Sequence, residues 1–351
     1  MSGFTSIVLA AGMGTRMRSD FPKVLHPLCG VPMIEHVIDA LTQAGAARIV
    51  VVVGHRAEHV QATVGDRVEY VYQAEQKGTG HAVMQTAGLL QGTKGPILIT
   101  YGDAPLYRPE TFRDFVAAHV ESGAAGSILT AIVDDATGYG RIVRSAEGQF
   151  VRVVEQRDAT PEEAAIREFN TGTYCIQGDK LFEGLAALTP DNAQGEYYLP
   201  DVLTWLKKRG LSVRIQVLDD ADEARGINDR KQLAEAEAIM RQRIREYWME
   251  RGVTIVDPAT TWIDKSVQIG QDTILFPGTL LEGDTVVGRR CRIGPFACVR
   301  SARIGDDSVI DRSNVEDVDL PAGSAVGPGT HHSIGPSQAR CAWLFARANQ
   351  Q

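Results

Sequence analysis

A six-residue repeat toward the end of the 351-residue chain constrains its fold more than any other feature. Each phrase begins with an aliphatic residue, and a small residue sits four positions later. The first residues of these phrases are Ile269, Leu275, Leu281, Val287, Ile293, Ile304, Ile310 and Val326. This rhythm is typical of a parallel β-helix, in which the aliphatic side chain fills a triangular coil and the small residue fits its corner. We therefore predict a short left-handed β-helix over residues 252–336.

Two segments flank this repeat. Residues 229–251 are predicted to form a linker helix, because apolar residues recur at helical spacing and the other face is heavily charged. Residues 337–351 form a C-terminal tail with an apolar run at 341–346. Stacked repeats need closing at their ends, so we interpret this run as a cap for the β-helix.

Residues 1–228 alternate apolar runs with helical patterns and are predicted to form a separate domain. The predicted strands lie at 7–10, 49–53, 68–72 and 97–100, and the predicted helices at 33–44, 80–90 and 109–120. Continuously apolar strands separated by helices indicate an α/β fold with a mainly parallel sheet covered on both faces. Ligands bind beyond the carboxyl ends of such strands, so the loops after the strands are the candidate sites.

Composition excludes several classes of protein. Lys plus Arg is 36 and Asp plus Glu is 44, so the net charge is −8, a poor match for duplex nucleic acid. The five cysteines form no C-x-x-C pair, which argues against a zinc cage or a disulfide framework and favours the reducing cytoplasm. No window approaches the ~20 apolar residues of a membrane span, and the N-terminal apolar run lacks a preceding basic region. We expect no nucleic-acid partner and no membrane partner.

The loop after the first strand combines close backbone approach with positive charge. Gly12 and Gly14 let the backbone approach a ligand, and their N–H groups can point at phosphate oxygens. Arg16 offers a fork of donors and Lys23 a compact charge. The spacing matches neither G-x-G-x-x-G nor the P-loop, and glycines in a simple turn are the alternative.

The complete string, L-A-A-G-M-G-T-R-M followed by P-K, resembles the signature of sugar-nucleotide pyrophosphorylases. These enzymes join a nucleoside triphosphate to a sugar 1-phosphate. The resemblance implies a Rossmann-like nucleotidyltransferase domain of the GT-A type, with Arg16 and Lys23 as catalytic residues. It also implies that the following residues bind the nucleotide: Leu9, Ala10, Ala11, Gly12, Gly14 and Thr15.

The loop at 73–82 points to the base. Amide side chains such as those of Gln73 and Gln76 can match the donor and acceptor edge of a nucleobase, and Gly78 and Thr79 can approach it. The phrase resembles the uracil-recognising loop of N-acetylglucosamine-1-phosphate uridyltransferases, which implies UTP as a substrate. A strand end followed by a helix N-cap at Thr79 is the structural alternative.

The loop at 101–106 carries a candidate metal ligand. Asp103 follows an apolar strand, where a carboxylate is well placed to hold Mg²⁺. The phrase Gly226-Ile227-Asn228-Asp229 resembles a family element whose Asn is the second Mg²⁺ ligand. Asn228 as the N-cap of the following helix is the alternative, although Asp229 could take that role instead.

Three further phrases, near 137–142, 154–159 and 168–172, resemble the uridyltransferase pattern in order and approximate spacing. The resemblance implies that the Gly140 backbone, Glu155 and Asn170 hold the sugar hydroxyls and the acetamido group. Tyr101 and Gly102 are also predicted to contact the sugar. The segment 192–198 looks like the family segment near the acetamido pocket.

The implied reaction transfers UMP from UTP to N-acetylglucosamine 1-phosphate, for cell-wall peptidoglycan precursor synthesis. A sugar-phosphate oxygen attacks the α-phosphorus and pyrophosphate leaves, so catalysis is positioning plus charge neutralisation by Mg²⁺, Arg16 and Lys23. Two alternatives remain open. One is a pyrophosphorylase for another sugar, such as glucose 1-phosphate; the other is a catalytically silent nucleotide-sensing scaffold.

The C-terminal part departs from the similar bifunctional enzymes, which join this uridyltransferase to a glucosamine-1-phosphate acetyltransferase on a long β-helix. That second activity needs a histidine and an N-Y-D-G loop, and this sequence contains no N-Y-D-G. Only His331 and His332 lie at the end of the repeats, which favours an exposed or capping pair. We therefore expect no acetyltransferase activity. A short β-helix can trimerise, and a homotrimer through it is the partner state that the resemblance suggests.

Overall fold

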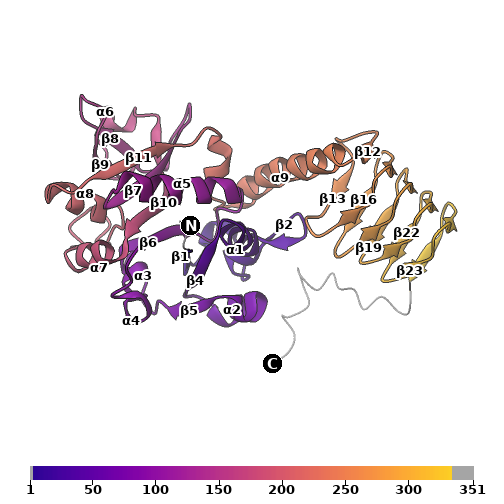
Figure 1. The fold of residues 1–351 in the computed structure, drawn as a ribbon, viewed down its shortest axis with the longest axis horizontal. Coiled ribbons are helices and arrows are strands. Elements are labelled where there is room, and N and C mark those ends of the chain that lie inside the picture. Colours follow the sequence, from indigo (N-terminus) through magenta and orange to yellow (C-terminus); the bar gives the residue numbers. More distant parts are fainter. Residues whose placement is uncertain (1–2, 334–351) are drawn as a thin grey trace. The chain divides into compact units, whose positions relative to one another are not determined.

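The computed structural model describes residues 3–333, which fall into two compact units. The first unit contains residues 3–26 and 32–232, and the second contains residues 27–31 and the chain from 233 onward. Figure 1 shows the elements of both units along the chain. The predicted cap at 341–346 lies outside the described residues.

The first unit is built on one sheet whose central path runs β11-β7-β10-β6-β1-β4-β5. The strands of this sheet are β1 (Phe4–Ala10), β4 (Ala46–Val53), β5 (Glu69–Tyr72), β6 (Pro96–Tyr101), β7 (Gly126–Ile132), β8 (Arg141–Arg144), β9 (Phe150–Val154), β10 (Glu168–Gln177) and β11 (Val213–Val217). The predicted strands in the first hundred residues are confirmed as β1, β4, β5 and β6, which pair in parallel. Strand β10 is antiparallel to both β6 and β7, and the β8–β9 hairpin joins its edge.

Helices cover both faces of this sheet because successive strand residues point to opposite sides. Val8 and Val51 pack into a core with α1, α2 and α5, whereas Ile7 and Val50 pack into a second core with α3, α7 and α8. The helices of the first unit are α1 (Met33–Gln43), α2 (Ala57–Val64), α3 (Thr79–Met84), α4 (Ala87–Leu90), α5 (Pro109–Ser122), α6 (Pro161–Ala164), α7 (Gly178–Ala186) and α8 (Asp201–Lys208). The arrangement is the predicted α/β sheet, covered on both sides.

The helix predicted at 80–90 is instead two short helices, α3 and α4. The break falls at Thr86, whose hydroxyl donates to the Val83 carbonyl over 2.7 Å. The Thr86 N–H also donates to Val83, over 3.0 Å, so the chain makes a tight turn there. A threonine hydroxyl that bonds to the nearby backbone competes with regular helix geometry, which explains the interruption.

The second unit is the predicted left-handed β-helix, preceded by the long helix α9 (Arg230–Glu250). Short strands stack in three parallel sheets, β12-β15-β18-β21-β24, β13-β16-β19-β22-β25 and β14-β17-β20-β23. The strands are β12 (Thr254–Ile255), β13 (Trp262–Ile263), β14 (Gln268–Ile269), β15 (Ile274–Leu275), β16 (Leu280–Glu282), β17 (Val286–Val287), β18 (Arg292–Ile293), β19 (Cys298–Arg300), β20 (Arg303–Ile304), β21 (Val309–Ile310), β22 (Asn314–Glu316), β23 (Asp319–Leu320), β24 (Ala325–Val326) and β25 (His331–Ser333). The aliphatic residues that begin the phrases are all buried in its interior.

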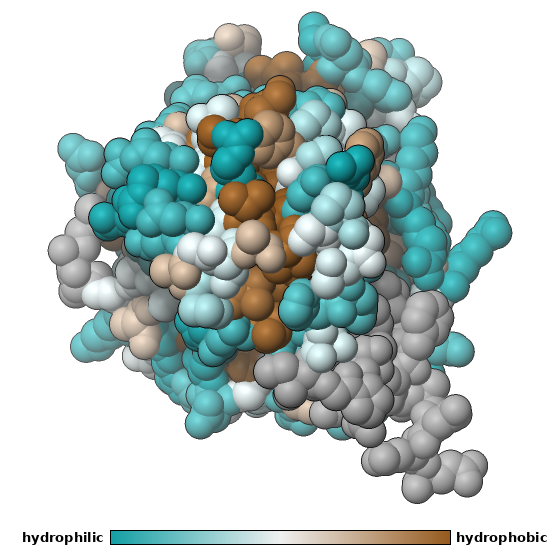
Figure 2. Space-filling model, turned by 90° about the vertical axis from the view of Figure 1, so that its right-hand side faces the viewer, coloured by the Kyte–Doolittle hydropathy of each residue, from teal (hydrophilic) through white to brown (hydrophobic). Residues whose placement is uncertain are grey.

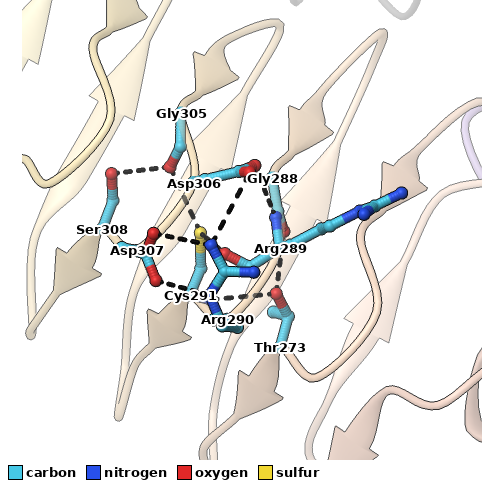
Figure 3. A network of polar contacts seen from close by, with 9 residues as sticks. All are labelled: Thr273, Gly288, Arg289, Arg290, Cys291, Gly305, Asp306, Asp307 and Ser308. Atoms are coloured by element: carbon cyan, nitrogen blue, oxygen red, sulfur yellow. Dashed lines mark hydrogen bonds and ion pairs between the residues drawn. The ribbon is translucent and has the colours of Figure 1, made fainter.

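The corners of the coils are closed by small polar residues and by paired charges (Figure 3). The Thr273 hydroxyl donates to the Gly288 carbonyl of the next coil over 2.8 Å and accepts the Cys291 N–H over 3.1 Å. On the outside, Arg290 makes a two-point contact with Asp307, with distances of 2.7 and 2.8 Å. Hydroxyl-to-carbonyl contacts of this kind recur in other coils, for example from Thr279 to the Ile293 carbonyl and from Thr285 to the Val299 carbonyl.

The column of buried aliphatic side chains inside the β-helix continues into the last coils. Figure 2 looks at the side where the last coils lie and shows hydrophobic residues through the middle of this face, bordered by hydrophilic ones. His331 and His332 lie on β25 and are exposed, and β25 pairs with β22.

The short segment 27–31 packs with the second unit, although sequence analysis placed it inside the first domain. It forms the hairpin of β2 (Pro27–Leu28) and β3 (Val31–Pro32). The Cys29 N–H donates to the Glu237 carboxylate over 3.0 Å, and the Lys265 N–H donates to the Cys29 carbonyl over 3.0 Å. Among the described residues, no helix is both long and apolar enough to cross a bilayer.

Candidate active site

A cavity of about 380 Å³ lies at the carboxyl ends of β1 and β6, where the α/β fold predicts a ligand site. Its lining residues are Leu9, Ala10, Ala11, Gly12, Lys23, Val24, Gln73, Gln76, Gly78, Thr79, Ala82, Tyr101, Asp103, Glu196 and Asn228. All but Val24, Ala82 and Glu196 are candidate site residues of the sequence analysis. The three predicted loops and the distant Asn228 therefore meet at one cavity.

The glycine loop forms one wall of the cavity. Gly14 has a φ of 62°, and a Cβ there would lie 2.6 Å from the Cβ of Lys23, so only glycine fits. Thr15 and Arg16 follow on a 3-10 turn, Thr15–Met17, and Arg16 is exposed. Gly14, Thr15 and Arg16 do not line the cavity. The Arg230 guanidinium donates to the Met17 carbonyl over 3.2 Å and anchors the end of this turn.

Lys23, Asp103 and Asn228 converge at the floor of the site. The Lys23 ammonium pairs with the Asp103 carboxylate and donates to the Asn228 side-chain oxygen over 3.1 Å. Asp229, not Asn228, caps the following helix, because its carboxylate accepts the Gln232 N–H over 2.8 Å. The Asn228 oxygen therefore faces the same cation as Asp103. One carboxylate and one amide oxygen around a positive charge match the oxygen donors that Mg²⁺ takes from a protein when phosphates supply the rest.

The two predicted base-reading amides are fixed by protein contacts. Gln76 donates from its amide nitrogen to the Ala11 carbonyl over 2.7 Å, which ties the second loop to the first. Gln73 is buried, and its amide nitrogen lies 3.1 Å from Nδ1 of His81. Thr79 is not the N-cap of the helix that follows, because Gly78 holds that position at a φ of 99°. The Thr79 hydroxyl instead accepts the Leu199 N–H over 3.1 Å.

The predicted sugar residues form a second polar group beside the cavity. The Asn170 N–H donates to the Gly140 carbonyl over 2.8 Å, and a Cβ at Gly140 would lie 3.0 Å from a Glu155 carboxylate oxygen. A Cβ at Gly172 would lie 2.0 Å from the Tyr101 ring, so Gly172 lets the ring lie against this backbone. Tyr101 lines the cavity and contacts the second group, which connects the two.

Burial and neighbouring charge perturb the acids of this group. Burial raises the pKa of Glu155, and Asp158, Asp201 and Glu196 raise that pKa further. Burial also raises the pKa of Tyr101. Each of these groups therefore favours its neutral form more than it would in water, and a partly desolvated acid beside other polar groups is typical of a ligand site.

Sequence reasoning missed some residues of the site. Tyr174 exchanges hydrogen bonds with the Asn170 side chain at 2.7 and 3.0 Å, but it lies within a buried strand and carried no motif. Glu196 lies in the segment 192–198, which sequence analysis compared with the family segment near the acetamido pocket. No role was predicted for Glu196 itself. Gly102 donates its N–H to the Leu9 carbonyl over 2.9 Å and so contributes to the backbone of the site.

Known proteins are similar to this chain in sequence family and in fold. A family model described as a MobA-like NTP transferase domain matches residues 6–198, which include all three predicted loops. The fold is similar to that of a crystal structure of UDP-glucose pyrophosphorylase complexed with UDP-glucose, with a TM-score of 0.55 at 19% identity over 69% of this chain and 99% of that chain. The fold and the site define a sugar-phosphate nucleotidyltransferase.

Curated relatives narrow the class. The bifunctional protein GlmU of Exiguobacterium sibiricum is 47% identical over 326 residues, which cover 93% of this chain and 73% of the relative. The bifunctional protein GlmU of Levilactobacillus brevis is 48% identical, with coverage of 92% of this chain and 70% of the relative. The chain belongs to the GlmU family, and its nucleotidyltransferase unit is of the UDP-N-acetylglucosamine pyrophosphorylase type.

Proposed function

We propose that the first unit transfers UMP from UTP to N-acetylglucosamine 1-phosphate and releases pyrophosphate. The observation that carries the proposal is one cavity lined by the amides of Gln73 and Gln76 and by the Lys23–Asp103–Asn228 cluster. The predicted sugar residues lie beside this cavity and are connected to it through Tyr101. The reaction joins a nucleotide and a sugar phosphate at the phosphate between base and sugar. The site therefore needs contacts to the base, then to the phosphates, then to the sugar.

The residues of the cavity and those around it each have a role in this reaction. Gln73 and Gln76 read the uracil, and the glycine loop and Arg16 hold the triphosphate. Asp103 and Asn228 hold Mg²⁺, which when bound neutralises phosphate charge and orients the leaving group. Gly140, Glu155 and Asn170 hold the sugar hydroxyls and the acetamido group.

The chemistry needs no covalent intermediate on the protein. An oxygen of the sugar phosphate, already deprotonated at neutral pH, forms a bond to the α-phosphorus of UTP. The bond to pyrophosphate breaks, and pyrophosphate carries away the electron pair. Lys23 stabilises developing charge on phosphate and is not a base, so catalysis is positioning plus electrostatic stabilisation.

Pyrophosphate release tests the proposal. The full chain is given UTP, Mg²⁺ and a panel of sugar 1-phosphates, and release is expected only with N-acetylglucosamine 1-phosphate. Release with glucose 1-phosphate instead would assign the enzyme to that sugar. Silence with every sugar, with UTP still bound, would favour a nucleotide-sensing scaffold.

We further propose that these 351 residues carry no acetyltransferase activity. They contain no N-Y-D-G string, and the exposed His331–His332 pair has no surroundings that resemble that site. Glucosamine 1-phosphate with acetyl-CoA and a thiol reagent should give no signal.

Two further proposals concern where and how the chain acts. The stacked coils of the second unit support a homotrimer through the β-helix, which sedimentation can test. Cys29, Cys175 and Cys291 are free and buried, which supports a cytoplasmic location.

A further inference from the structure

The Lys23 ammonium lies between the two groups that we assign to the metal. It contacts Asp103, whose sequence position is 80 residues away, and Asn228, which is 205 residues away. The side chains of Lys23 and Asp103 are only 13% and 16% exposed, so the pair is largely shielded from water. One cation therefore contacts both of the oxygen groups that we assign to the metal.

We propose that Lys23 is a placeholder for the divalent cation, a positioning role that rests on the proposed function of the cavity. Its ammonium keeps Asp103 and Asn228 converged before a metal binds, and the ammonium must leave when the metal enters. A divalent ion held by both oxygens would take the place of the ammonium between them, and its two charges would repel the ammonium there. The two cations exclude one another.

The same side chain has a second place to go. The near end of Lys23 lies close to Gly14, because a Cβ at Gly14 would lie only 2.6 Å from the Lys23 Cβ. The far end is a flexible stem with a compact charge, and the glycine loop beside it is the predicted triphosphate site. A bound triphosphate offers the ammonium a new anionic partner. Nucleotide binding thus frees Asp103 and Asn228 at the moment when the metal is needed.

This arrangement predicts weak divalent-metal binding by the nucleotide-free chain. The competition is a coupling between two cations, and couplings between ligands are typically 5–150-fold. Removing the ammonium should therefore tighten metal binding by roughly tenfold or more. A residue that only supports the structure, or only stabilises the transition state, would not produce a gain in metal affinity.

Mn²⁺ binding measured by electron paramagnetic resonance tests the proposal on the full chain without nucleotide. Lys23→Met, which keeps the length of the stem, should bind Mn²⁺ roughly tenfold more tightly than the unchanged chain. Lys23→Arg keeps a cation and should bind like the unchanged chain. Arg16→Met, a matched loss of a nearby exposed cation, should also leave the affinity unchanged, and Asp103→Asn should abolish binding. Thermal unfolding confirms that each variant is folded.

The proposal that Lys23 is a placeholder would be wrong if Lys23→Met bound Mn²⁺ as tightly as the unchanged chain or more weakly. It would also be wrong if neither protein bound Mn²⁺. A second arm adds UTP: the factor by which UTP tightens Mn²⁺ binding should be smaller in Lys23→Met, and equal factors would also contradict the proposal. Pyrophosphate release by the unchanged chain separates the two hypotheses. Activity without the Mn²⁺ gain refutes the placeholder alone, whereas the gain without activity refutes the proposed uridylyl transfer alone.

Discussion

The two units use polar residues in opposite ways. In the first unit, polar side chains from distant parts of the sequence converge on one cavity. Several contacts there each join one particular pair of residues. In the second unit, polar side chains repeat along the coils and pair with the equivalent position of the next coil, as Arg290 does with Asp307. Convergence produces a site, whereas repetition produces a scaffold.

The interiors differ in the same way. The β-helix interior is filled by one aliphatic residue per phrase, and the corners hold small residues whose hydroxyls bond to carbonyls. The first unit buries polar groups as well, among them Gln73 and the guanidinium of Arg141, because its loops need fixed positions. The comparison teaches that a substitution in the first unit should affect chemistry, and one in the second should affect stability.

The largest expected effect is at Asp103. Asp103→Asn removes the charge that pairs with Lys23 and weakens the proposed metal site, so kcat for pyrophosphate release should fall by about 10²–10³. The melting temperature should change little, because the side chain lies at the cavity and not in a core. A near-normal kcat in a folded Asp103→Asn variant would contradict the idea that the converging polar residues of the first unit form a catalytic site.

The sequence predicts the β-helix interior well and the cavity only in part. Leu275 and Ile293 each begin a phrase of the six-residue repeat, and this repeat predicts that both side chains are buried. A local sequence pattern is therefore enough there. Lys23 and Asn228 are 205 residues apart, and only the resemblance to a family could bring them together. No local rule predicts such a pairing, because it depends on how the whole sheet is ordered.

Other features escape the sequence for similar reasons. The antiparallel placement of β10 between β6 and β7 depends on long-range pairing, which no local pattern within the strand reports. The packing of the segment 27–31 on the second unit rests on backbone groups, such as the Cys29 N–H, that no side-chain pattern reports. Tyr174 was missed because a buried tyrosine in a strand usually packs in a core.

A core substitution in the β-helix tests the other half of the comparison. Leu281 is fully buried, so Leu281→Ala should lower the free energy of unfolding of this unit by about 2–5 kcal/mol. Uridylyl transfer should keep its kcat and its KM for UTP, because the proposed site lies within the first unit. Urea denaturation followed by circular dichroism measures the loss.

The matched control for Leu281 is Val256, which is 53% exposed. Val256→Ala removes apolar surface that is already in water and should change the free energy of unfolding by less than about 0.5 kcal/mol. If Leu281→Ala lowered kcat while the chain stayed folded, the separation of chemistry from scaffold would be wrong.

A smaller effect is expected at Asp264, a half-buried acid of the second unit. Burial raises the pKa of Asp264 from 3.8 to about 6, and Glu282 and Glu237 also raise it, although the Gly283 N–H lowers it. A raised carboxyl pKa in the folded state gives stability below the unfolded pKa that is lost as pH rises to the folded pKa. Ionised Asp264 should therefore destabilise the unit above about pH 6.

Asp264→Asn removes this pH-dependent loss and keeps an acceptor for the Gly283 N–H, which donates to Asp264 over 3.0 Å. The difference in unfolding free energy between variant and unchanged chain should rise from pH 4 to pH 7.5 by on the order of 2 kcal/mol in favour of the variant. Denaturation at both pH values measures it. A difference that is the same at both would show that the Asp264 carboxyl does not titrate as described.

The smallest effect is expected at the ion pair between Arg290 and Asp307, at the corner of the β-helix coils. Arg290 is an exposed residue in the left-handed region, with a φ of 55°, so its backbone strain and its ion pair with Asp307 oppose one another. Arg290→Ala loses the pair and keeps the strain, whereas Arg290→Gly loses the pair and relieves the strain. The Gly variant should therefore be the more stable of the two, and both should differ from the unchanged chain by less than Asp264→Asn does at pH 7.5. Added salt should bring the unchanged chain closer to Arg290→Ala, because it screens the pair, but should leave the two variants apart. Two variants of equal stability would show that the corner backbone stores no strain.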